Sequence, residues 1–279
     1  MFPVFAFSAL LSGCGLFRVS RGEAELIRQA VSGLEAVEPA SERKLLVFSK
    51  TRGFRHSSIK YCNRAVEIMG HQTGAFECVF SEDMGVFEAE YLRGFDAVCF
   101  NNSTRLRFDE AQRAALMEFV RGGKGIVSIH GATDSFYDWP QGAEMVGGTF
   151  DGHPWWFTGT WGFKVDQPGH PLTESLDAEG FKVSDEIYRH RPAGEEIRKR
   201  STVLVSLDMS DNKTASKAKR PSDNDIPVSW IHRFGGGRVF HMGFGHNHEI
   251  YWNEAIMGHL LGGIQFACGD LDGKLKIKN

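Results

Sequence analysis

Residues 125–136, GIVSIHGATDSF, have the pattern of a buried strand that stops at a histidine followed by a glycine. Residues 126–129 are mostly apolar and favour a strand, and Gly131 permits a sharp turn. Such a corner lies at the carboxyl edge of a sheet, where other folds hold a nucleophilic serine or cysteine. Here it holds His130. The stretch therefore predicts a strand of an α/β sheet and an imidazole placed for chemistry.

Apolar strands alternate with amphipathic helices around this stretch. Strands are expected at 44–49, 76–80, 96–100 and 125–129, and helices at 58–69 and 109–120. Strands are also expected at 159–165 and 202–208, a hairpin at 227–233 and 238–242, and a last helix at 254–267. Fully apolar strands between helices indicate a mostly parallel sheet with helices on both faces. The fold class is α/β, with a β-rich C-terminal half that ends in a hairpin and a helix.

The composition is that of a soluble globular protein. The chain has 279 residues, 42% hydrophobic and 24% charged, and a formal net charge of −3. This balance leaves no basic surface for nucleic acid, so no nucleic-acid partner is expected. The local basic run at residues 213–220, KTASKAKR, has polar neighbours and is predicted to be a solvated loop.

The N-terminus has a different character. Residues 1–11 are almost wholly apolar, and the following Leu-Ser-Gly-Cys, which ends at Cys14, is typical of a bacterial lipobox. We expect a lipoprotein signal at 1–14 with lipid on Cys14, a linker with a helix at 15–43, a domain at 44–268 and a tail at 269–279. The apolar run is too short to span a membrane and lacks a preceding Lys or Arg, so a buried or disordered N-terminus is the alternative.

The remaining cysteines, Cys62, Cys78, Cys99 and Cys268, show no CxxC spacing. Two of them, Cys78 and Cys99, lie inside apolar strand-like runs. Buried free thiols are therefore favoured over disulfides or zinc ligands.

Histidines follow three of the expected strands. These are His56 after the first strand, His130 with Asp134 after the fourth, and His241, His246 and His248 at the end of the hairpin. Because the carboxyl ends of parallel strands share one edge of a sheet, these side chains are predicted to gather there. Each histidine alone is as readily a structural residue, so the prediction depends on their convergence.

Two further segments offer polar groups. His153 lies in the glycine-rich stretch MVGGTFDGHPWW, residues 145–156. In FKVSDEIYR, residues 181–189, alternation puts Glu186 and Tyr188 on one face and Asp185 on the other. Trp155 and Trp156 could stack on sugar rings, or pack in the core.

Five stretches together resemble the ThuA-like, or trehalose-utilisation, family. They are VFSKTRGFRHSSI (47–59), GGKGIVSIHGATDSFYDWP (122–140), VGGTFDGHPW (146–155), DEIYR (185–189) and PVSWIHRFGGGRVFHMGFGHNHEIY (227–251). The resemblance implies a flavodoxin-like sheet similar to class I glutamine amidotransferases and a link to carbohydrate metabolism. It draws attention to the motif residues His56, His130, His153, Glu186, Tyr188, His241 and His246. The amidotransferase cysteine is missing, since His130 occupies its corner, so the chain is not expected to be a glutamine amidotransferase.

The predicted chemistry is proton transfer by imidazole, which needs little pKa adjustment near neutral pH. We assign catalysis to His130, His241 and Glu186, and substrate contacts to His56, Asp134, His153, Tyr188 and His246. The substrate would be a sugar or keto-sugar glycoside, whose carbonyl makes a neighbouring proton acidic. No cofactor is required in this scheme. Alternatively, two or three of these histidines with Glu186 hold a zinc or manganese ion.

The leading prediction is thus a carbohydrate-metabolism enzyme anchored by lipid at the periplasmic side of the cell envelope. It would be cytoplasmic if the N-terminal run is not a signal. The alternatives are a non-catalytic carbohydrate-binding lipoprotein and a structural envelope component. The expected partner is a small-molecule carbohydrate, with a homo-oligomer left open.

Overall fold

The computed structural model describes residues 17–271 of the chain. The expected signal at 1–14, its lipidation site Cys14 and most of the tail at 269–279 lie outside the described residues. Among residues 17–271, no helix combines the length and apolar character that a membrane crossing requires.

The described residues form eleven strands and eight α-helices. The strands are β1 (Lys44–Phe48), β2 (Glu77–Ser81), β3 (Ala97–Asn101), β4 (Gly125–Ile129), β5 (Thr149–Phe150), β6 (Thr160–Val165), β7 (Phe181–Ser184), β8 (His190–Arg191), β9 (Thr202–Leu207), β10 (Pro227–Phe234) and β11 (Gly237–Met242). The helices are α1 (Arg21–Ser32), α2 (Ile59–Thr73), α3 (Ala89–Leu92), α4 (Glu110–Arg121), α5 (Pro140–Val146), α6 (Gly194–Arg200), α7 (Asn212–Ala215) and α8 (Glu254–Cys268). Short 3₁₀ turns are η1 (Met84–Phe87), η2 (His130–Asp134), η3 (Pro171–Thr173), η4 (Pro221–Asn224) and η5 (His248–Trp252).

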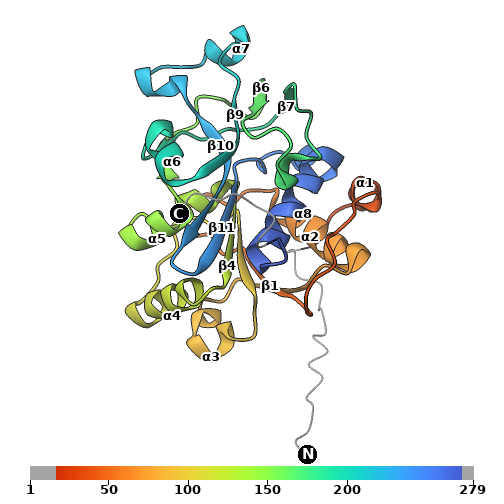
Figure 1. Ribbon diagram of the computed structural model, residues 1–279, viewed down its shortest axis with the longest axis vertical. Helices are drawn as coiled ribbons and strands as arrows, with labels where there is room; N and C mark the ends of the chain where they lie inside the picture. Colours follow the sequence, from red (N-terminus) through yellow and green to blue (C-terminus); the bar gives the residue numbers. More distant parts are fainter. Residues whose placement is uncertain (1–16, 272–279) are drawn as a thin grey trace, which may run out of the picture.

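Nine strands make one sheet, in the order β2-β1-β3-β4-β11-β10-β9-β6-β7 (Figure 1). The strands from β2 to β11 pair in parallel. The strands from β11 to β7 pair antiparallel. The parallel part has the flavodoxin-like order 2-1-3-4-5, with β11 as its fifth strand. The predicted fold class, including the β-rich C-terminal half and its hairpin and helix, is confirmed.

Helices cover both faces of the parallel part, as its apolar strands require. Leu45 and Val47 of β1 belong to the core under α1, α2 and α8. The alternate residues Leu46 and Phe48 belong to the core under α3, α4 and α5. Figure 1 shows these two layers on either side of the strands. A strand buried on both faces has no polar side, which is why its sequence reads as a continuous apolar run.

Predicted and observed elements agree closely in the parallel part. The strand predicted at 125–129 is β4 without change, and the other predicted strands there shift by one residue. The predicted helix at 58–69 continues to Thr73, where Gly74 ends it with φ of 66°. The basic run at 213–220 lies in the segment that carries α7 and η4.

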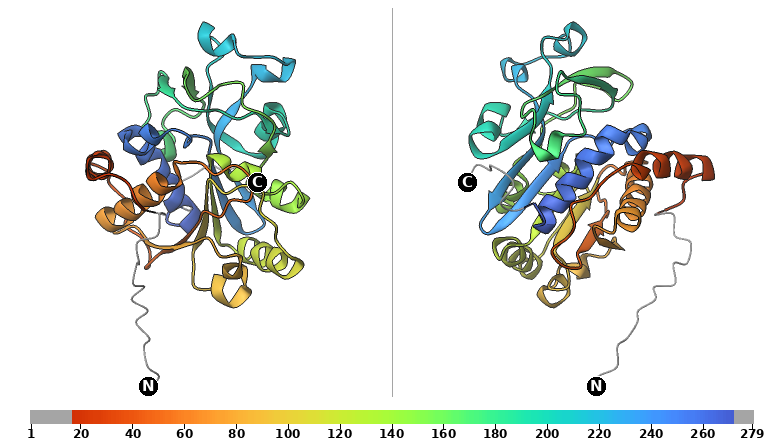
Figure 2. Two further views of the ribbon diagram at one scale, coloured as in Figure 1. Left: turned by 180° about the vertical axis from the view of Figure 1, so that it is seen from behind. Right: turned by 45° about the vertical axis from the view of Figure 1, so that its right-hand side comes forward.

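The helix expected in the linker is α1, but it packs on the domain instead of spacing it from an anchor. Ser20 and Glu23 cap its N-terminus reciprocally. Its apolar stripe, with Ile27 fully buried, lies against α2 and α8. Figure 2 (right) shows α1, in red, beside these two helices. The helix is therefore part of the folded unit, which reaches N-terminally beyond residue 44.

Candidate functional site

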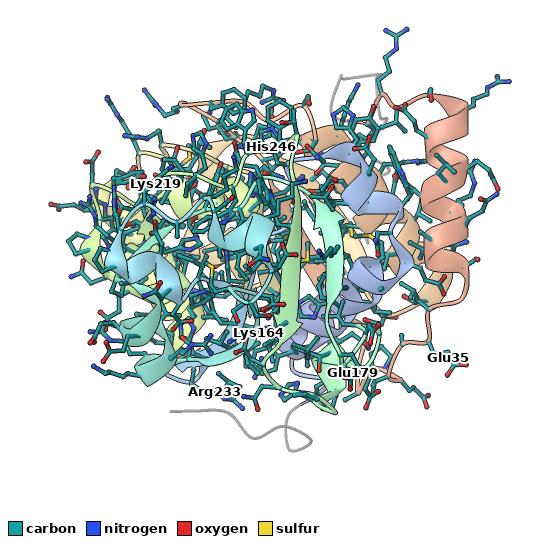
Figure 3. The ribbon with its side chains drawn as sticks, turned by 90° about the horizontal axis from the view of Figure 1, so that it is seen from above. Glu35, Lys164, Glu179, Lys219, Arg233 and His246 are labelled. Carbon is teal, nitrogen blue, oxygen red and sulfur yellow. The ribbon has the colours of Figure 1, made fainter. Side chains whose placement is uncertain are left out.

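The carboxyl ends of three strands bring histidines to one edge of the sheet. Phe48 of β1 pairs with Phe100 of β3, while Ile129 of β4 pairs with Asn101 of β3 and with Met242 of β11. The three strands therefore stop at nearly the same level. The segments that follow them carry His56, His130 and His246. Figure 3 shows His246 and Arg233 on opposite sides of the molecule. Arg233 lies near the turn between β10 and β11.

His130 makes the sharp corner at the end of β4. Its φ is 42°, in the left-handed region that a residue other than glycine enters at a cost of about 1–3 kcal/mol. The neighbouring Gly131 has another role, because a Cβ there would lie 2.8 Å from Cε1 of His56. Gly131 lies in the turn η2, as expected, but the left-handed backbone of the corner belongs to His130. His130 supplies the turn, and the glycine lets His56 approach.

The orientation of His130 follows from its hydrogen bond. Nδ1 lies 2.9 Å from the carbonyl oxygen of Gly243, which can only accept, so Nδ1 carries the proton and donates it. Nε2 is then the lone-pair nitrogen, and it is buried without a hydrogen-bond partner. This nitrogen is available to a proton donor or to a metal ion.

Three imidazoles surround the carboxylate of Glu186. The ring centroids of His56 and His130 are 5.0 Å apart, and those of His246 lie 5.2 and 5.5 Å from these two rings. Oε2 of Glu186 is 3.1 Å from Nδ1 of His246 and 3.7 Å from Nε2 of His130. Its other oxygen, Oε1, is 3.3 Å from Nδ1 of His153. Glu186 and four predicted histidines, three of them in contact with its carboxylate, thus gather at one place.

Glu186 and Tyr188 share one face of an extended segment, as alternation predicts, although β7 itself ends at Ser184. Ile187 forms a bridge to Trp155 and faces the core. Tyr188 places its hydroxyl 3.2 Å from Nε2 of His56. The segment therefore directs its polar side chains to the histidines without belonging to a strand.

Asp185, on the other face of this segment, was not predicted as a site residue. It is fully buried and accepts hydrogen bonds of 2.7 Å from the backbone N–H groups of Gly245 and Asn247. These two bonds hold the loop that carries His246. Burial raises the pKa of Asp185, and the charges and backbone bonds around it only partly oppose this.

Burial and mutual charge set the protonation of the cluster. Burial, and then the electrostatic effect of the neighbouring imidazoles of His130 and His246, lower the pKa of His56 to about 2, so this imidazole is neutral. Burial alone would raise the pKa of Glu186, but its contacts with His130 and His246 outweigh burial and lower it. The site therefore holds an ionised carboxylate beside a neutral imidazole.

A cleft of about 800 Å³ opens onto the cluster. It is lined by His56, His153, Glu186 and His246, whereas His130 is fully buried behind them. Five ring side chains line the cleft in a row, and the centroids of neighbouring rings are 4.9–5.6 Å apart. They are, in order, Phe150, His153, Trp156, Phe157 and His246. Polar residues line the rest of the cleft. Thr104 donates a hydrogen bond to the carbonyl of Phe54, and Arg105 forms an ion pair with Asp134 at 3.2 Å. An apolar rim with a few directed polar groups is typical of small-molecule sites.

His241 does not join this cleft. Its side chain is fully buried against the sheet. Nδ1 lies 3.0 Å from the hydroxyl of Ser128, and the ring centroid lies 3.9 Å from that of Trp230. His248 also lies apart, 2.8 Å from the hydroxyl of Ser57. The structure therefore does not place His241 with His130 at the cleft, whereas Glu186 lies 3.7 Å from His130 as predicted.

The two tryptophans of the glycine-rich stretch separate. Trp155 is fully buried and donates to the carbonyl of Thr214, so it belongs to the core. Trp156 is 46% exposed and lines the cleft. The four cysteines within the described residues are free, as predicted. None lines the cleft, so the site has no thiolate for glutamine hydrolysis.

Comparison with known proteins agrees with this architecture. A ThuA-like protein from Bacteroides uniformis matches with a TM-score of 0.66 and 19% identity, covering 81% of this chain and 91% of its own. A ThuA-like protein from Parabacteroides merdae matches with a TM-score of 0.64 and 16% identity, covering 82% and 91%. At these identities the matches show the fold alone.

A cytoplasmic protein from Salmonella typhimurium shares the fold more distantly, with a TM-score of 0.52 and 10% identity over 78% of this chain and 98% of its own. A search of curated proteins gives no significant match. The family model described as ThuA, trehalose utilisation, matches residues 44–267. The chain belongs to the ThuA family.

Proposed function

We propose that this chain is an enzyme that acts on a sugar or keto-sugar glycoside in the cleft around Glu186. The observation that carries the proposal is the convergence of His56, His130, His153 and His246 on one ionised carboxylate beneath an aromatic rim. Trp156 offers an exposed indole face on which a pyranose ring can stack. The family description, trehalose utilisation, supports a carbohydrate as the ligand.

The reaction class that fits these groups is mild acid/base chemistry. A keto group acidifies the proton on the neighbouring carbon, so that a base held beside this carbon can remove it. An imidazolium can then protonate the leaving glycosidic oxygen. Burial in a fixed cleft orients these groups, which contributes as much as their basicity. Hydrolysis, elimination and isomerisation all draw on such steps.

Turnover of a defined panel tests the proposal. The purified protein is incubated with glucosides and their keto derivatives, and products are followed by nuclear magnetic resonance. We expect conversion of at least one member, and a loss of about 10²- to 10⁴-fold in Glu186→Gln. Glu195→Gln, at an exposed position of α6, is the matched control and should keep the full rate. Equal rates for the two variants would contradict the proposal.

A non-catalytic carbohydrate-binding lipoprotein is the second candidate, favoured by the exposed face of Trp156. It predicts sugar binding without conversion of any panel member. The lipobox at Cys14 supports a place at the cell envelope for either candidate. Lipid on Cys14, measured by mass spectrometry of the protein from membranes, tests that placement.

A further inference from the structure

The structure assigns a binding site for one divalent transition-metal ion to His56, His130, Glu186 and His246. The inference deepens the proposed function, on which the catalytic use of the ion rests. Each of the four residues offers one ligand atom, and these atoms all lie within 4.8 Å of one another. Bonds of about 2.1 Å place the ligand atoms of a tetrahedral ion about 3.4 Å apart. Small side-chain shifts therefore close the four around a single ion.

The nitrogens that face this centre lack other partners. Nδ1 of His56 and Nε2 of His130 belong to side chains at most 3% exposed, and neither has a hydrogen-bond partner. Nδ1 of His246 lies 3.1 Å from Glu186 without forming a hydrogen bond. A buried polar atom left unpaired costs about 1–3 kcal/mol. A single cation bound between the three nitrogens and the carboxylate would give each of them a partner.

The opposite nitrogens of two of these rings are already fixed. Nδ1 of His130 donates to the carbonyl of Gly243, which leaves Nε2 unprotonated toward the centre. With His56 bound through Nδ1, its Nε2–H can donate to the hydroxyl of Tyr188 at 3.2 Å. Metal-binding histidines usually have such an outer partner, which sets the tautomer and the ring plane. The arrangement therefore holds the rings as ligands before any ion arrives.

The two carboxylate oxygens of Glu186 face different histidines. Oε1 lies 3.3 Å from Nδ1 of His153, at the more open side of the cleft, without forming a hydrogen bond. Oε2, the oxygen nearest to His130 and His246, is the one that faces the ion. His153 is then the imidazole that remains for proton transfer.

The donor set selects the class of ion. Three imidazole nitrogens and one carboxylate suit zinc, manganese or another first-row divalent ion, whereas magnesium and calcium prefer oxygen ligands only. When bound, such an ion polarises a sugar carbonyl or hydroxyl oxygen. Under this assignment Glu186 and the three histidines act as ligands instead of bases, and His153 supplies the proton transfer of the proposed reaction.

Metal binding is tested without any sugar. Protein that carries no polyhistidine tag is stripped with EDTA and titrated calorimetrically with Zn²⁺, Mn²⁺ and Mg²⁺, and its metal content is measured by elemental analysis. We expect about one zinc or manganese ion per chain and much weaker binding of Mg²⁺. Absence of stoichiometric binding for both transition ions would overturn the assignment.

Variants locate the ion. His246→Gln and Glu186→Gln should weaken binding by more than about 100-fold, beyond the 10- to 100-fold effect typical of an outer partner. His248→Gln, two residues from His246 and bonded to Ser57, is the matched control and should bind as wild type. Circular dichroism checks that each variant is folded, and the more exposed His246 gives the more tolerant site if Glu186→Gln unfolds. Wild-type affinity in folded His246→Gln overturns the assignment.

The outcome is separable from that of the proposed function. Turnover by a protein that binds neither transition ion would overturn the metal assignment and leave the proposed enzyme standing. Stoichiometric binding that the variants abolish, with no conversion of any sugar, would support the metal site and count against the enzyme.

Discussion

Gly131 and His56 are in such close contact that a Cβ atom at residue 131 would lie 2.8 Å from Cε1 of the imidazole. Two segments that are far apart in the chain thus meet where only a hydrogen atom fits. The contact fixes the position of His56 relative to His130, the residue before the glycine. The site therefore depends on a residue that has no functional group.

Gly131→Ala should weaken the site while keeping the fold. The added methyl group displaces the His56 ring, and we expect metal affinity or turnover to fall at least about tenfold, because small misplacements of reacting groups are costly. Titration calorimetry and the panel assay measure the two effects. Gly22→Ala, where a Cβ meets nothing within 4 Å, should change neither. An unchanged Gly131→Ala protein would show that His56 can move freely.

Asp185→Asn should loosen the loop that carries His246. The amide can accept one of the two backbone hydrogen bonds but presents N–H to the other donor, which leaves a buried N–H unpaired. We expect the free energy of unfolding to fall by about 1–3 kcal/mol and metal affinity to fall about 10- to 100-fold. Urea unfolding and calorimetry measure these values. Asp138→Asn, at an exposed position, serves as the control.

The two adjacent tryptophans should respond in opposite ways. Trp156→Ala removes an exposed face from the cleft, so we expect weaker sugar binding at nearly unchanged stability. Trp155→Ala removes a fully buried indole, so the free energy of unfolding should fall by about 3–5 kcal/mol. Thermal unfolding and sugar titration of both variants separate the roles. Equal sugar affinity in Trp156→Ala and wild type would exclude stacking on this residue.

Acid should destabilise the fold through buried neutral histidines. Burial lowers the pKa of both His232 and His259 from 6.5 to about 4. Between these values the unfolded chain binds protons that the folded chain does not. The stability that each residue contributes is complete above pH 6.5 and declines as the pH falls toward 4. The decline is at most about 1.4 kcal/mol per pH unit for each residue.

Urea unfolding of His259→Gln at several pH values between 4.5 and 7 measures this dependence. The variant should show a smaller decrease of unfolding free energy over this range than wild type. His71→Gln, at an exposed position of α2, should keep the wild-type slope. If unfolding free energy depends on pH equally in His259→Gln and wild type, His259 does not contribute to the acid sensitivity.

The parallel half of the fold was predictable because its strands are buried on both faces. β4 needs only the apolar run before His130, and Asp109 and Gln112 form a capping box that starts α4. The antiparallel part was less regular, since β7 ends at Ser184 while the extended chain continues to Tyr188. Pairing partners, which sequence periodicity does not identify, decide where such a strand ends.

The site was predictable to the level of strand ends but not of single positions. His130 and His246 follow β4 and β11, so their place at the edge of the sheet could be inferred. His241 still belongs to β11, where it lies opposite Ser128 of β4, and its side chain is buried in the core. His130 lies two residues beyond Ser128, so a shift of two positions in the register separates a residue of the cluster from a residue of the core. Asp185 could have been suspected from its place in DEIY, but its backbone partners are distant in sequence.

The four residues assigned to the ion are divided between the two halves of the chain, since His56 and His130 lie in the N-terminal half and Glu186 and His246 in the C-terminal half. Neither half of the chain can assemble the centre alone. Capture of cobalt or zinc during refolding should therefore lag behind the recovery of secondary structure and report the final docking of the two halves. The same dependence makes a single proteolytic nick between them, followed by separation, enough to erase the centre.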